Sequence, residues 1–560
     1  MYDPLEDENG QPRFAVSTGD MSWNKTGSWR YMRPLYDNKI PPCTVGCPAH
    51  EKIPQYFAYV KDKKYEQAWH IILEDNPLPG VTGRVCYHPC EAVCNRGDYD
   101  ESIAIHNMER FVADQNLKHH IPQSFIRDKH EETIAIIGSG PAGLSAAYQL
   151  TLLGYTVTIF EAAEQAGGML RLGIPEYRLP REVLDKEIED IVRLGVTIKT
   201  AIRVGRDIGM DTLQRDFNAV LIATGAYKSW GMNLPGEELK GIASGLSFLK
   251  EYNLTGSAPI GKRVVVVGGG NTAIDTARSA LRLGADVTIV YRRSKAEMPA
   301  VPEEVEDAQR EGIHIRFLTN PVGFSGNGKV EQIRLIRMEL GEADESGRRR
   351  PIPIKGSEYT IDADQVLLAI GEVPDLDFLP DSFKLKKDRL LVDHFQRTGQ
   401  PGIFACGDAS TGPIGTVVDA IGTGKRAAHS IHQYLSSKTV HIPEEPTDGV
   451  PFDTLNLDYF QQESRPQERQ HHSTQLKGDF NEVNLGIGED DAVYEANRCF
   501  SCGTCTYCDN CLIFCPDVAI RFDVDKHEYV INYDFCKGCG ICVQECPRNA
   551  MSYEEELKWA

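Results

Sequence analysis

The sequence predicts a multidomain α/β protein with two Rossmann-like dinucleotide-binding folds and iron–sulfur sites, and three patterns carry that prediction. A glycine-rich loop follows a strand-like run twice, at residues 138–143 and 268–273. One cysteine spacing occurs twice between residues 505 and 547. Five more cysteines stand between residues 43 and 94, and the long middle of the chain holds only Cys406. Such clustering is typical of metal ligands rather than of a disulfide scaffold.

The composition fits a large redox protein of a reducing compartment. The 560 residues suggest about three or four domains. No apolar run approaches the roughly 18 residues that a membrane helix needs, and the acidic first residues are unlike a signal peptide. The formal charge of −21 argues against nucleic acid, whose binders usually carry a basic stripe. We therefore expect a cytoplasmic chain without membrane insertion or nucleic-acid binding.

The two glycine loops belong to an internal repeat. Gly138 and Gly268 stand 130 residues apart, as do Glu161 and Tyr291. In each copy the glycines lie between a strand and a helix, where they permit a tight turn and bring backbone amides to a pyrophosphate. The expected cofactor contacts are Gly138, Gly140 and Gly143 in the first copy, and Gly268, Gly270, Asn271, Thr272 and Ala273 in the second.

The residue that ends the second strand of each copy separates the two ligands. Glu161 in the first copy can accept hydrogen bonds from ribose hydroxyls. Tyr291 replaces this acid in the second copy, and Arg292 and Arg293 follow it. Two guanidinium groups suit a 2′-phosphate, which favours NADP(H) over NAD(H) in the second fold. The alternative is that these arginines form surface ion pairs.

The repeated C-terminal spacing, C-x2-C-x2-C-x3-C-P, predicts two [4Fe-4S] clusters. Three cysteines in one tight loop reach three corners of a cluster, and the cysteine before the proline reaches the other cluster. Zinc ribbons lack this compressed triple, and disulfides need an oxidising compartment. The expected ligands are Cys505, Cys508, Cys511 and Cys546 for one cluster, and Cys536, Cys539, Cys542 and Cys515 for the other.

A third segment points to flavin in the first fold. Gly407 and Asp408 end a short strand, and a segment with helix character begins near Thr416. Asp408 could hydrogen-bond a ribityl chain, and the positive end of the helix would face the flavin pyrimidine, where negative charge appears on reduction.

These motifs together resemble the small subunit of NADPH-dependent glutamate synthase over residues 40–437. The FAD half of dihydropyrimidine dehydrogenase and the larger subunit of NADH-dependent ferredoxin:NADP oxidoreductases are related. The resemblance implies FAD in the first fold, the nicotinamide cofactor in the second, and insertion of the second fold into the first. It adds four cofactor-binding residues, which are Gly168, Arg178, Gly225 and Gly371.

The resemblance also implies a helical iron–sulfur domain at the N-terminus, from which this chain departs. The family's first cysteine pair is missing, since no cysteine precedes Cys43. By position, the flavin-side cluster takes Cys47, Cys86, Cys90 and Glu109. Cys94 is the alternative to Glu109, because a glutamate on a helix is usually a solvated side chain.

The missing pair resembles a segment near the other end of the chain. We hypothesise that Cys499 and Cys502 fold back to join Cys43 and Cys94 in a permuted [4Fe-4S] site. The competing interpretation is that Cys499 and Cys502 are spare thiols or alternative ferredoxin ligands. Cys406 stays unassigned and is interpreted as a small packing residue.

The expected organisation has seven segments. They are an N-terminal arm at 1–40, the helical iron–sulfur domain at 41–128, the first FAD-binding segment at 129–255, the NAD(P)H-binding domain at 256–372, the second FAD-binding segment at 373–437, a surface linker at 438–478, and the ferredoxin domain at 479–560. A stretch of the arm is similar to small iron–sulfur subunits of 2-oxoacid:ferredoxin oxidoreductases.

The resemblance implies an FAD-dependent oxidoreductase that moves hydride between NADP(H) and FAD and single electrons through [4Fe-4S] clusters, with no catalytic acid or base. We expect it to be the electron-transfer subunit of a larger enzyme, with a 2-oxoacid oxidoreductase or a glutamate-synthase-like large subunit as partner. One alternative is a stand-alone NADPH:ferredoxin oxidoreductase that uses soluble ferredoxin. Another is a non-catalytic iron–sulfur relay.

Overall fold

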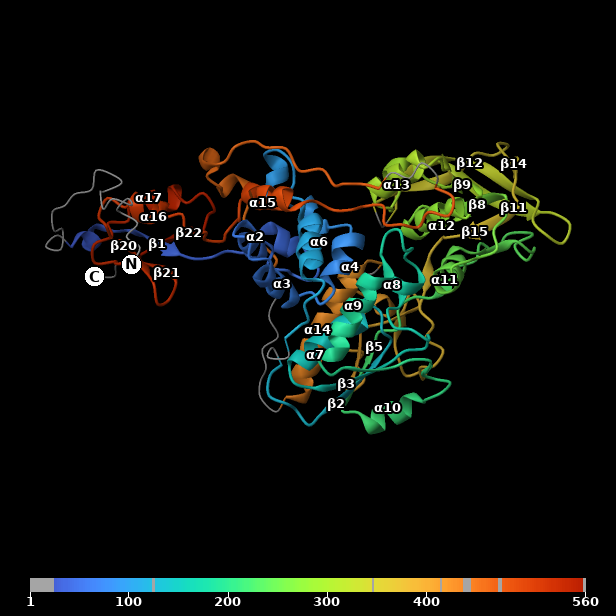
Figure 1. Ribbon diagram of the computed structural model, residues 1–560, viewed down its shortest axis with the longest axis horizontal. Helices are drawn as coiled ribbons and strands as arrows, with labels where there is room; N and C mark the ends of the chain where they lie inside the picture. Colours follow the sequence, from blue (N-terminus) through green and yellow to red (C-terminus); the bar gives the residue numbers. More distant parts are fainter. Residues whose placement is uncertain are drawn as a thin grey trace.

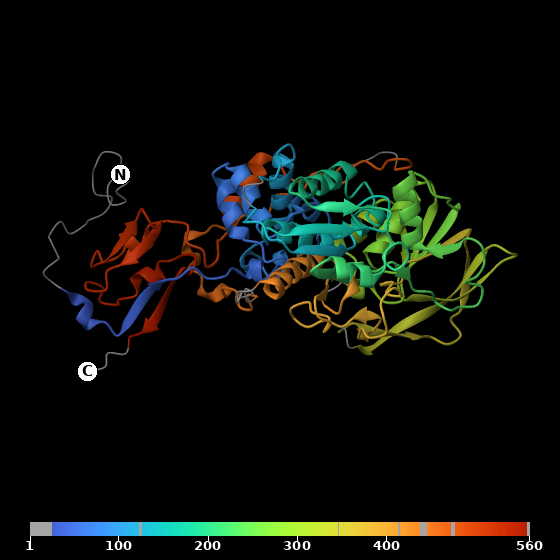
Figure 2. The ribbon, with the colours of Figure 1, turned by 90° about the horizontal axis from the view of Figure 1, so that it is seen from below.

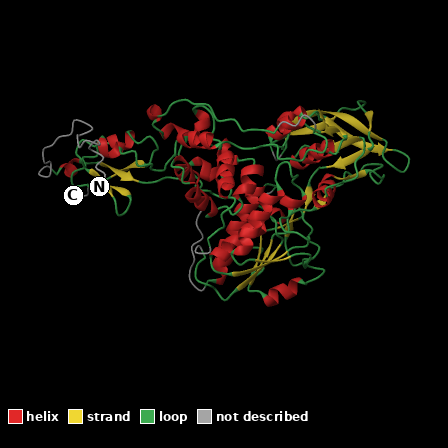
Figure 3. Cartoon of the chain, viewed as in Figure 1, coloured by secondary structure: helices red, strands yellow, loops and turns green. Residues whose placement is uncertain are grey.

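The computed structural model describes residues 25–122, 126–344, 347–412, 415–436, 445–471 and 476–556. The molecule is elongated, with a small C-terminal module at one end and the second nucleotide fold at the other (Figure 1). Helices fill the centre, and sheets lie on either side of them and below (Figure 3). Residues 1–24 of the expected arm and residues 438–444 and 472–475 of the expected linker lie outside the described residues. Among the described helices none is long and apolar enough to span a membrane.

The central helical domain is built from short helices that bury one apolar face each. In α2 (Ile53–Lys61) the buried side chains include Tyr56, Phe57 and Val60, at the three-to-four-residue spacing of one helix face. A helix from the far end of the chain, α15 (Glu489–Arg498), packs on α2 and α6. The other helices of the domain are α1 (Pro42–Gly46), α3 (Tyr65–Leu73), α4 (Pro79–Val85), α5 (Pro89–Ala92) and α6 (Ile105–Asn116).

The first nucleotide fold has a parallel five-stranded sheet in the order β19-β5-β2-β3-β4. Its central strands are almost entirely buried, since the side chains on both faces of the sheet belong to apolar clusters. The strands are β2 (Thr133–Ile137), β3 (Thr156–Phe160), β4 (Thr197–Lys199), β5 (Ala219–Ile222) and β19 (Ile403–Ala405). The helices are α7 (Pro141–Leu152), α8 (Met169–Leu172), α9 (Arg181–Arg193), α10 (Met210–Asp216) and α14 (Val417–Leu435).

The second fold repeats this design in the order β10-β9-β8-β15-β7. Its parallel strands are β7 (Ile242–Ser244), β8 (Arg263–Val267), β9 (Asp286–Val290), β10 (His314–Arg316) and β15 (Gln365–Leu368), and its helices are α11 (Gly245–Thr255), α12 (Asn271–Arg282) and α13 (Pro302–Arg310). An antiparallel sheet is added by β11 (Thr319–Ser325), β12 (Gln332–Ala343), β13 (Arg349–Pro353) and β14 (Tyr359–Asp362).

The second fold is inserted into the first. The chain crosses over at β6 (Lys228–Ser229) and returns at β16 (Glu372–Val373), and these two strands pair with each other. After the hairpin of β17 (Leu385–Lys386) and β18 (Arg389–Leu390), the chain re-enters the first sheet at β19. The crossover lies earlier than the expected boundary at residue 255, because β7 pairs with β15 and α11 packs on α12 in the second fold.

The C-terminal module contains two short helices and two small sheets. Its elements are α16 (Asn510–Ile513), α17 (Ile541–Gln544), β20 (Ile520–Asp523), β21 (Glu528–Ile531) and β22 (Met551–Glu555). The arm supplies a strand to this module, since β1 (Met32–Tyr36) pairs antiparallel with β22. Figure 2 shows this N-terminal strand lying among the C-terminal ones.

Residues 476–487, here named the strap, lie between the two nucleotide folds and the helical domain. The amide of Val483 donates to the carbonyl oxygen of Tyr177 over 2.9 Å. Glu482 forms ion pairs with Arg84 of α4 and Arg110 of α6, each at 2.8 Å. The sequence predicted that the ferredoxin domain begins at residue 479, within the strap. These contacts and the packing of α15 instead join residues 479–498 to the central domains.

Candidate cofactor sites

The first glycine loop has the backbone that its sequence predicts. Gly138 has φ +105°, and a Cβ there would overlap the carbonyl oxygen of Ala223. A Cβ on Gly143 would overlap the carbonyl oxygen of Gly138, so α7 lies directly on the loop. Gly140 precedes α7, and a Cβ on it would meet nothing within 4 Å. The loop therefore leaves space at a helix N-terminus, where a pyrophosphate can bind.

Glu161 lies at the carboxyl end of β3 and faces this loop. Its carboxylate accepts hydrogen bonds from the amide of Ser139 at 2.9 Å, from the Ser139 hydroxyl at 2.6 Å and from the amide of Ala163 at 2.8 Å. These bonds fix the side chain beside the first glycine loop.

The N-terminus of α14 lies beside Asp408. Thr416 caps the helix by accepting a hydrogen bond from the amide of Asp419, and Asp408 accepts one from the amide of Gly415. Two glycines inside α14 let it approach its neighbours closely. A Cβ on Gly424 would overlap Ala142 of α7, and a Cβ on Gly422 would overlap the carbonyl oxygen of Pro48, the residue after Cys47. This helix therefore packs against both α7 and the segment that follows Cys47.

Four residues added by the resemblance lie in different surroundings. Gly168 has φ +55° and lies against Gly140, so it adjoins the first loop. Gly225 and Gly371 have φ of +68° and +122°, beside the rings of Tyr227 and Trp230.

Arg178 is the fourth, and it is buried at the contact between the two folds. Its guanidinium forms ion pairs with Asp275 of α12 at 2.8 Å and with Glu304 of α13 at 3.1 Å. Both ion pairs described for the Arg178 side chain are thus with the second fold.

The second glycine loop matches the first. Gly268 has φ +149°, and a Cβ there would overlap the carbonyl oxygen of Ala369. Gly270 precedes α12, which begins with Asn271, Thr272 and Ala273. The ring of Tyr291 lies directly on Gly269, and its hydroxyl donates to the carbonyl oxygen of Glu297 over 2.7 Å.

The two arginines after Tyr291 differ in their surroundings. Arg293 is buried and donates to Asp344 over 2.6 Å and to the carbonyl oxygen of Arg349 over 2.8 Å. Arg292 is exposed at the surface. Partial desolvation lowers the pKa of Arg292, and the nearby cations Arg293 and Arg348 lower it further. Sequence reasoning missed Arg348, although three consecutive arginines at residues 348–350 are a visible signal.

A first cysteine cavity lies beside α14. Cys47, Cys86, Cys90 and Glu109 line it together with Val418 of α14. We name it the flavin-side cavity. Glu51, which sequence reasoning missed, lines it too.

The two carboxylates of this cavity share one amide. Asn76 donates to Glu51 over 3.0 Å and to Glu109 over 2.7 Å. Burial raises the pKa of both carboxylic acids, and the charge of Glu51 raises the pKa of Glu109 further. Glu109 is thus a buried side chain and not a solvated one.

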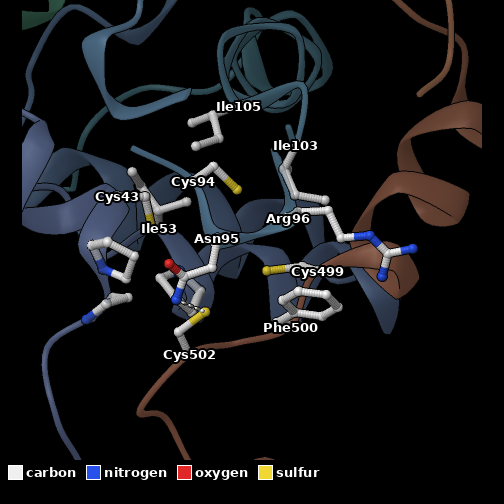
Figure 4. Close-up of a pocket in the computed structure, with 13 residues that line it drawn as sticks. Cys43, Ile53, Cys94, Asn95, Arg96, Ile103, Ile105, Cys499, Phe500 and Cys502 are labelled. Carbon is white, nitrogen blue, oxygen red and sulfur yellow. Dashed lines mark hydrogen bonds between the residues drawn. The ribbon is translucent and has the colours of Figure 1, made fainter. Parts of the chain in front are cut away.

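A second cysteine cavity draws its thiols from both ends of the chain. Cys43, Cys94, Cys499 and Cys502 line it, and their sulfur atoms converge in Figure 4. We name it the two-ended cavity. Burial raises the pKa of Cys43, and the neighbouring thiols of Cys94, Cys499 and Cys502 raise it further.

The two cavities are neighbours. Ile53 and Ile105 line both of them. Asn95 donates a hydrogen bond to the sulfur of Cys502 over 3.5 Å. Cys94 lies in the two-ended cavity and is not among the residues described around the flavin-side cavity.

The eight remaining cluster cysteines form two groups in the C-terminal module. Burial raises the pKa of Cys511, as do the nearby thiols of Cys505, Cys508 and Cys546. Burial likewise raises the pKa of Cys542 to about 12, and the thiols of Cys515, Cys536 and Cys539 contribute. Cys508 and Cys539 are the exposed members, one in each group. Cys406 is buried next to Gly407 and is not among the residues that line either cavity.

The donor sets fit iron–sulfur clusters. Every cysteine of the sequence lies in the described residues, and none forms a disulfide. Several sulfur atoms accept backbone N–H bonds, such as those from Ala519 to Cys515 and from Ala550 to Cys546, each at 3.3 Å. Such bonds are typical around cluster thiolates, whose charge they stabilise.

Comparisons with known proteins agree with this geometry. Residues 132–424 match the family described as pyridine nucleotide-disulphide oxidoreductase. Residues 35–121 match dihydropyrimidine dehydrogenase domain II, a 4Fe-4S cluster family, and residues 529–552 match a 4Fe-4S binding domain.

Three curated relatives are similar over most of the chain. The NADP(+)-dependent formate dehydrogenase subunit beta of Moorella thermoacetica is 44% identical over 82% of this chain and 70% of its own. The NADPH-Fe(3+) oxidoreductase subunit beta of Geobacter sulfurreducens is 39% identical over 83% of this chain and 75% of its own. The glutamate synthase [NADPH] small chain of Escherichia coli is 35% identical over 70% of this chain and 89% of its own.

The chain is an oxidoreductase that uses FAD, NADP(H) and [4Fe-4S] clusters, as its domain matches and relatives indicate. It belongs to the pyridine nucleotide-disulphide oxidoreductase family, in the branch of iron–sulfur flavoproteins that includes the small chain of NADPH-dependent glutamate synthase.

Proposed function

We propose that this chain carries electrons between NADP(H) and a substrate-oxidising partner subunit through four [4Fe-4S] sites arranged in sequence. When bound, FAD supplies the exchange between hydride and single electrons. The chain's own contribution is to bind and position the cofactors. This is supported by the two glycine loops, which each lead into a helix N-terminus, and by Glu161, which bonds to the first loop.

The ligand assignments follow the four groups of donors. The flavin-side site takes Cys47, Cys86, Cys90 and Glu109, and the two-ended site takes Cys43, Cys94, Cys499 and Cys502. The position of Cys94 in the two-ended cavity and the burial of Glu109 support Glu109 as the fourth ligand. The C-terminal module holds one cluster on Cys505, Cys508, Cys511 and Cys546, and one on Cys515, Cys536, Cys539 and Cys542.

The single observation that carries the proposal is that the two cavities share lining residues. Ile53 and Ile105 separate the flavin-side cavity from the two-ended cavity, and Val418 of α14 lines the former. Cys502 of the two-ended cavity is three residues before Cys505 of the C-terminal module. These relations support a path from the flavin-binding fold to the exposed Cys508 and Cys539.

The partner proposal starts from the relatives. We place a formate-oxidising subunit first, because the relative named as the beta subunit of such an enzyme is similar over more of this chain than the glutamate synthase small chain is. A 2-oxoacid oxidoreductase or a glutamate-synthase-like large subunit is second. The proposed compartment is the cytoplasm, because thiolate ligands need a reducing environment.

Iron analysis tests the two-ended site. In a Cys499→Ser, Cys502→Ser double variant we expect the iron content to fall by about four atoms per chain, with NADPH still bleaching the bound flavin. Cys406→Ala is the control and should leave iron unchanged. Unchanged iron in the double variant would remove the two-ended site from the pathway.

A stand-alone NADPH:ferredoxin oxidoreductase is the second candidate, favoured by the exposure of Cys508 and Cys539. Turnover of NADPH with soluble ferredoxin by the purified chain, at the rate of the whole complex, would favour it over the subunit proposal.

A further inference from the structure

The N-terminal arm, residues 25–39, is built into the C-terminal module. The amide of Gly27 donates to the carbonyl oxygen of Asp534 over 2.9 Å, and that of Lys39 donates to Gly503 over 2.8 Å. Between these two points β1 pairs with β22 along its whole length. The arm therefore contacts the module before, between and after its two cysteine motifs. Figure 2 shows the N-terminal strand beside the C-terminal ones.

One arm side chain reaches a cysteine of the second motif. Arg30 is 6% exposed, and its Nη1 donates to the carbonyl oxygens of Cys536 at 2.8 Å and Tyr533 at 2.7 Å. Its Nε and Nη2 both donate to the carboxylate of Glu556 at 2.7 Å. A fixed cation and its carboxylate thus lie against the backbone of one proposed cluster ligand.

A second arginine of the arm, Arg33 in β1, offers an internal comparison. Arg33 also lies over the ring of Tyr533, at 5.6 Å compared with 5.0 Å for Arg30. It forms an ion pair with Glu554, and the Arg33 side chain is 38% exposed. Within the described residues, the hydrogen bonds and ion pairs found for Arg33 involve no cysteine.

We propose that Arg30 sets the reduction potential of the cluster held by Cys515, Cys536, Cys539 and Cys542, and that Glu556 moderates its effect. This rests on the ligand assignment proposed above. Reduction of a cluster adds one electron and therefore one negative charge. A nearby buried cation stabilises that charge and raises the potential, whereas a carboxylate lowers it. The arm is then a component of the redox centre and not only a tether.

The test compares three variants of the full chain with the clusters loaded, namely Arg30→Gln, Glu556→Gln and Arg33→Gln. Iron and sulfide analysis comes first, followed by an anaerobic redox titration monitored by electron paramagnetic resonance. Arg30→Gln should lower the ratio of reduced to oxidised cluster at a fixed potential by at least roughly threefold, which is about 28 mV at 59 mV per tenfold. Glu556→Gln should raise this ratio, and Arg33→Gln should leave it unchanged.

The opposite signs separate electrostatics from a structural role. If the contact were merely structural, Arg30→Gln and Glu556→Gln would shift the reduction potential in the same direction, or would shift the potentials of both clusters of the module alike. Either result overturns the proposal. Unchanged potentials with full iron content overturn it as well. Arg30→Lys, which keeps the cation, should restore most of the potential. If Arg30→Gln loses iron, the sign of the Glu556→Gln shift decides.

A separate measurement tests the assignment of Cys536 as a cluster ligand. If replacing Cys536 by serine leaves the iron content unchanged, the proposed ligands are wrong, whatever the arginine variants do.

Discussion

Phe480 of the strap stacks on Tyr252 of α11, with ring centroids 4.4 Å apart and planes inclined by 24°. The same ring lies 6.2 Å from that of Tyr177, which packs in turn under the guanidinium groups of Arg278 and Arg282. One side chain from beyond the second fold therefore touches both nucleotide folds where they meet.

Removing this ring should loosen the second fold. Phe480→Ala should lower the free energy of unfolding by about 1–2 kcal/mol, since the ring is half-buried and a fully buried one is worth more. Limited proteolysis should then cut the strap several-fold faster, and flavin reduction by NADPH should slow. Val524→Ala, at a site that is 72% exposed, is the matched control. Equal cleavage rates in the two variants would contradict the assigned role of the strap.

Arg292 and Arg293 should have separable effects on the nicotinamide cofactor. Arg292→Gln should raise the KM for NADPH by about 10- to 100-fold and leave that for NADH nearly unchanged, because a charge-assisted bond to a 2′-phosphate is worth about 1.5–3 kcal/mol. Arg293→Gln should affect both cofactors alike, since Arg293 is bonded to Asp344. Steady-state kinetics with both cofactors decide. A preference for NADPH that survives Arg292→Gln would speak against this assignment.

Glu109 and Cys94 should belong to different clusters. Glu109→Ala should alter or remove one cluster signal, and Cys94→Ser should alter another, so that the double variant shows both losses. Electron paramagnetic resonance of the reduced protein and iron analysis measure this. If the two single variants remove the same signal, Cys94 and Glu109 share a site, and the geometry of the two cavities has been misinterpreted.

Glu187 should make stability depend on pH. Its carboxylate accepts the amides of Gly80 and Val81 of α4, and burial raises its pKa from 4.5 to about 8. Between these values the folded state holds a proton that the unfolded state has lost, so stability falls as pH rises from 4.5 towards 8. The apparent Tm of the wild type should therefore fall over this range more than that of Glu187→Gln. If the Tm of the wild type and that of Glu187→Gln changed with pH in parallel, Glu187 would be ionised in the folded state.

Local patterns were enough to predict the features that lie within one stretch of chain. The two glycine loops depend on neighbouring residues, so spacing alone predicted the turns at Gly138 and Gly268 that lead from a buried strand into α7 and α12. The C-terminal cysteine triples are local in the same way. The insertion of one fold into the other followed from the family resemblance.

Other features depend on partners distant in sequence and could not be seen in a pattern. Arg293 has the residue type of a phosphate ligand, and only the structure shows that its guanidinium is bonded to Asp344, fifty-one residues later. Arg178 likewise bonds to Asp275 in the other fold. Glu51 has no motif around it, and its burial against Asn76 comes from the packing of the helical domain. The pairing of β1 with β22 joins segments about as far apart as the chain allows.

The two-ended cavity also relates cluster assembly to the order in which the chain is translated. Cys43 and Cys94 are translated some four hundred residues before Cys499 and Cys502. Until the ribosome has released the later pair, the early thiols have only half of their partners. A cluster on all four thiols, as proposed above, can therefore be completed only after residue 502 has been synthesised.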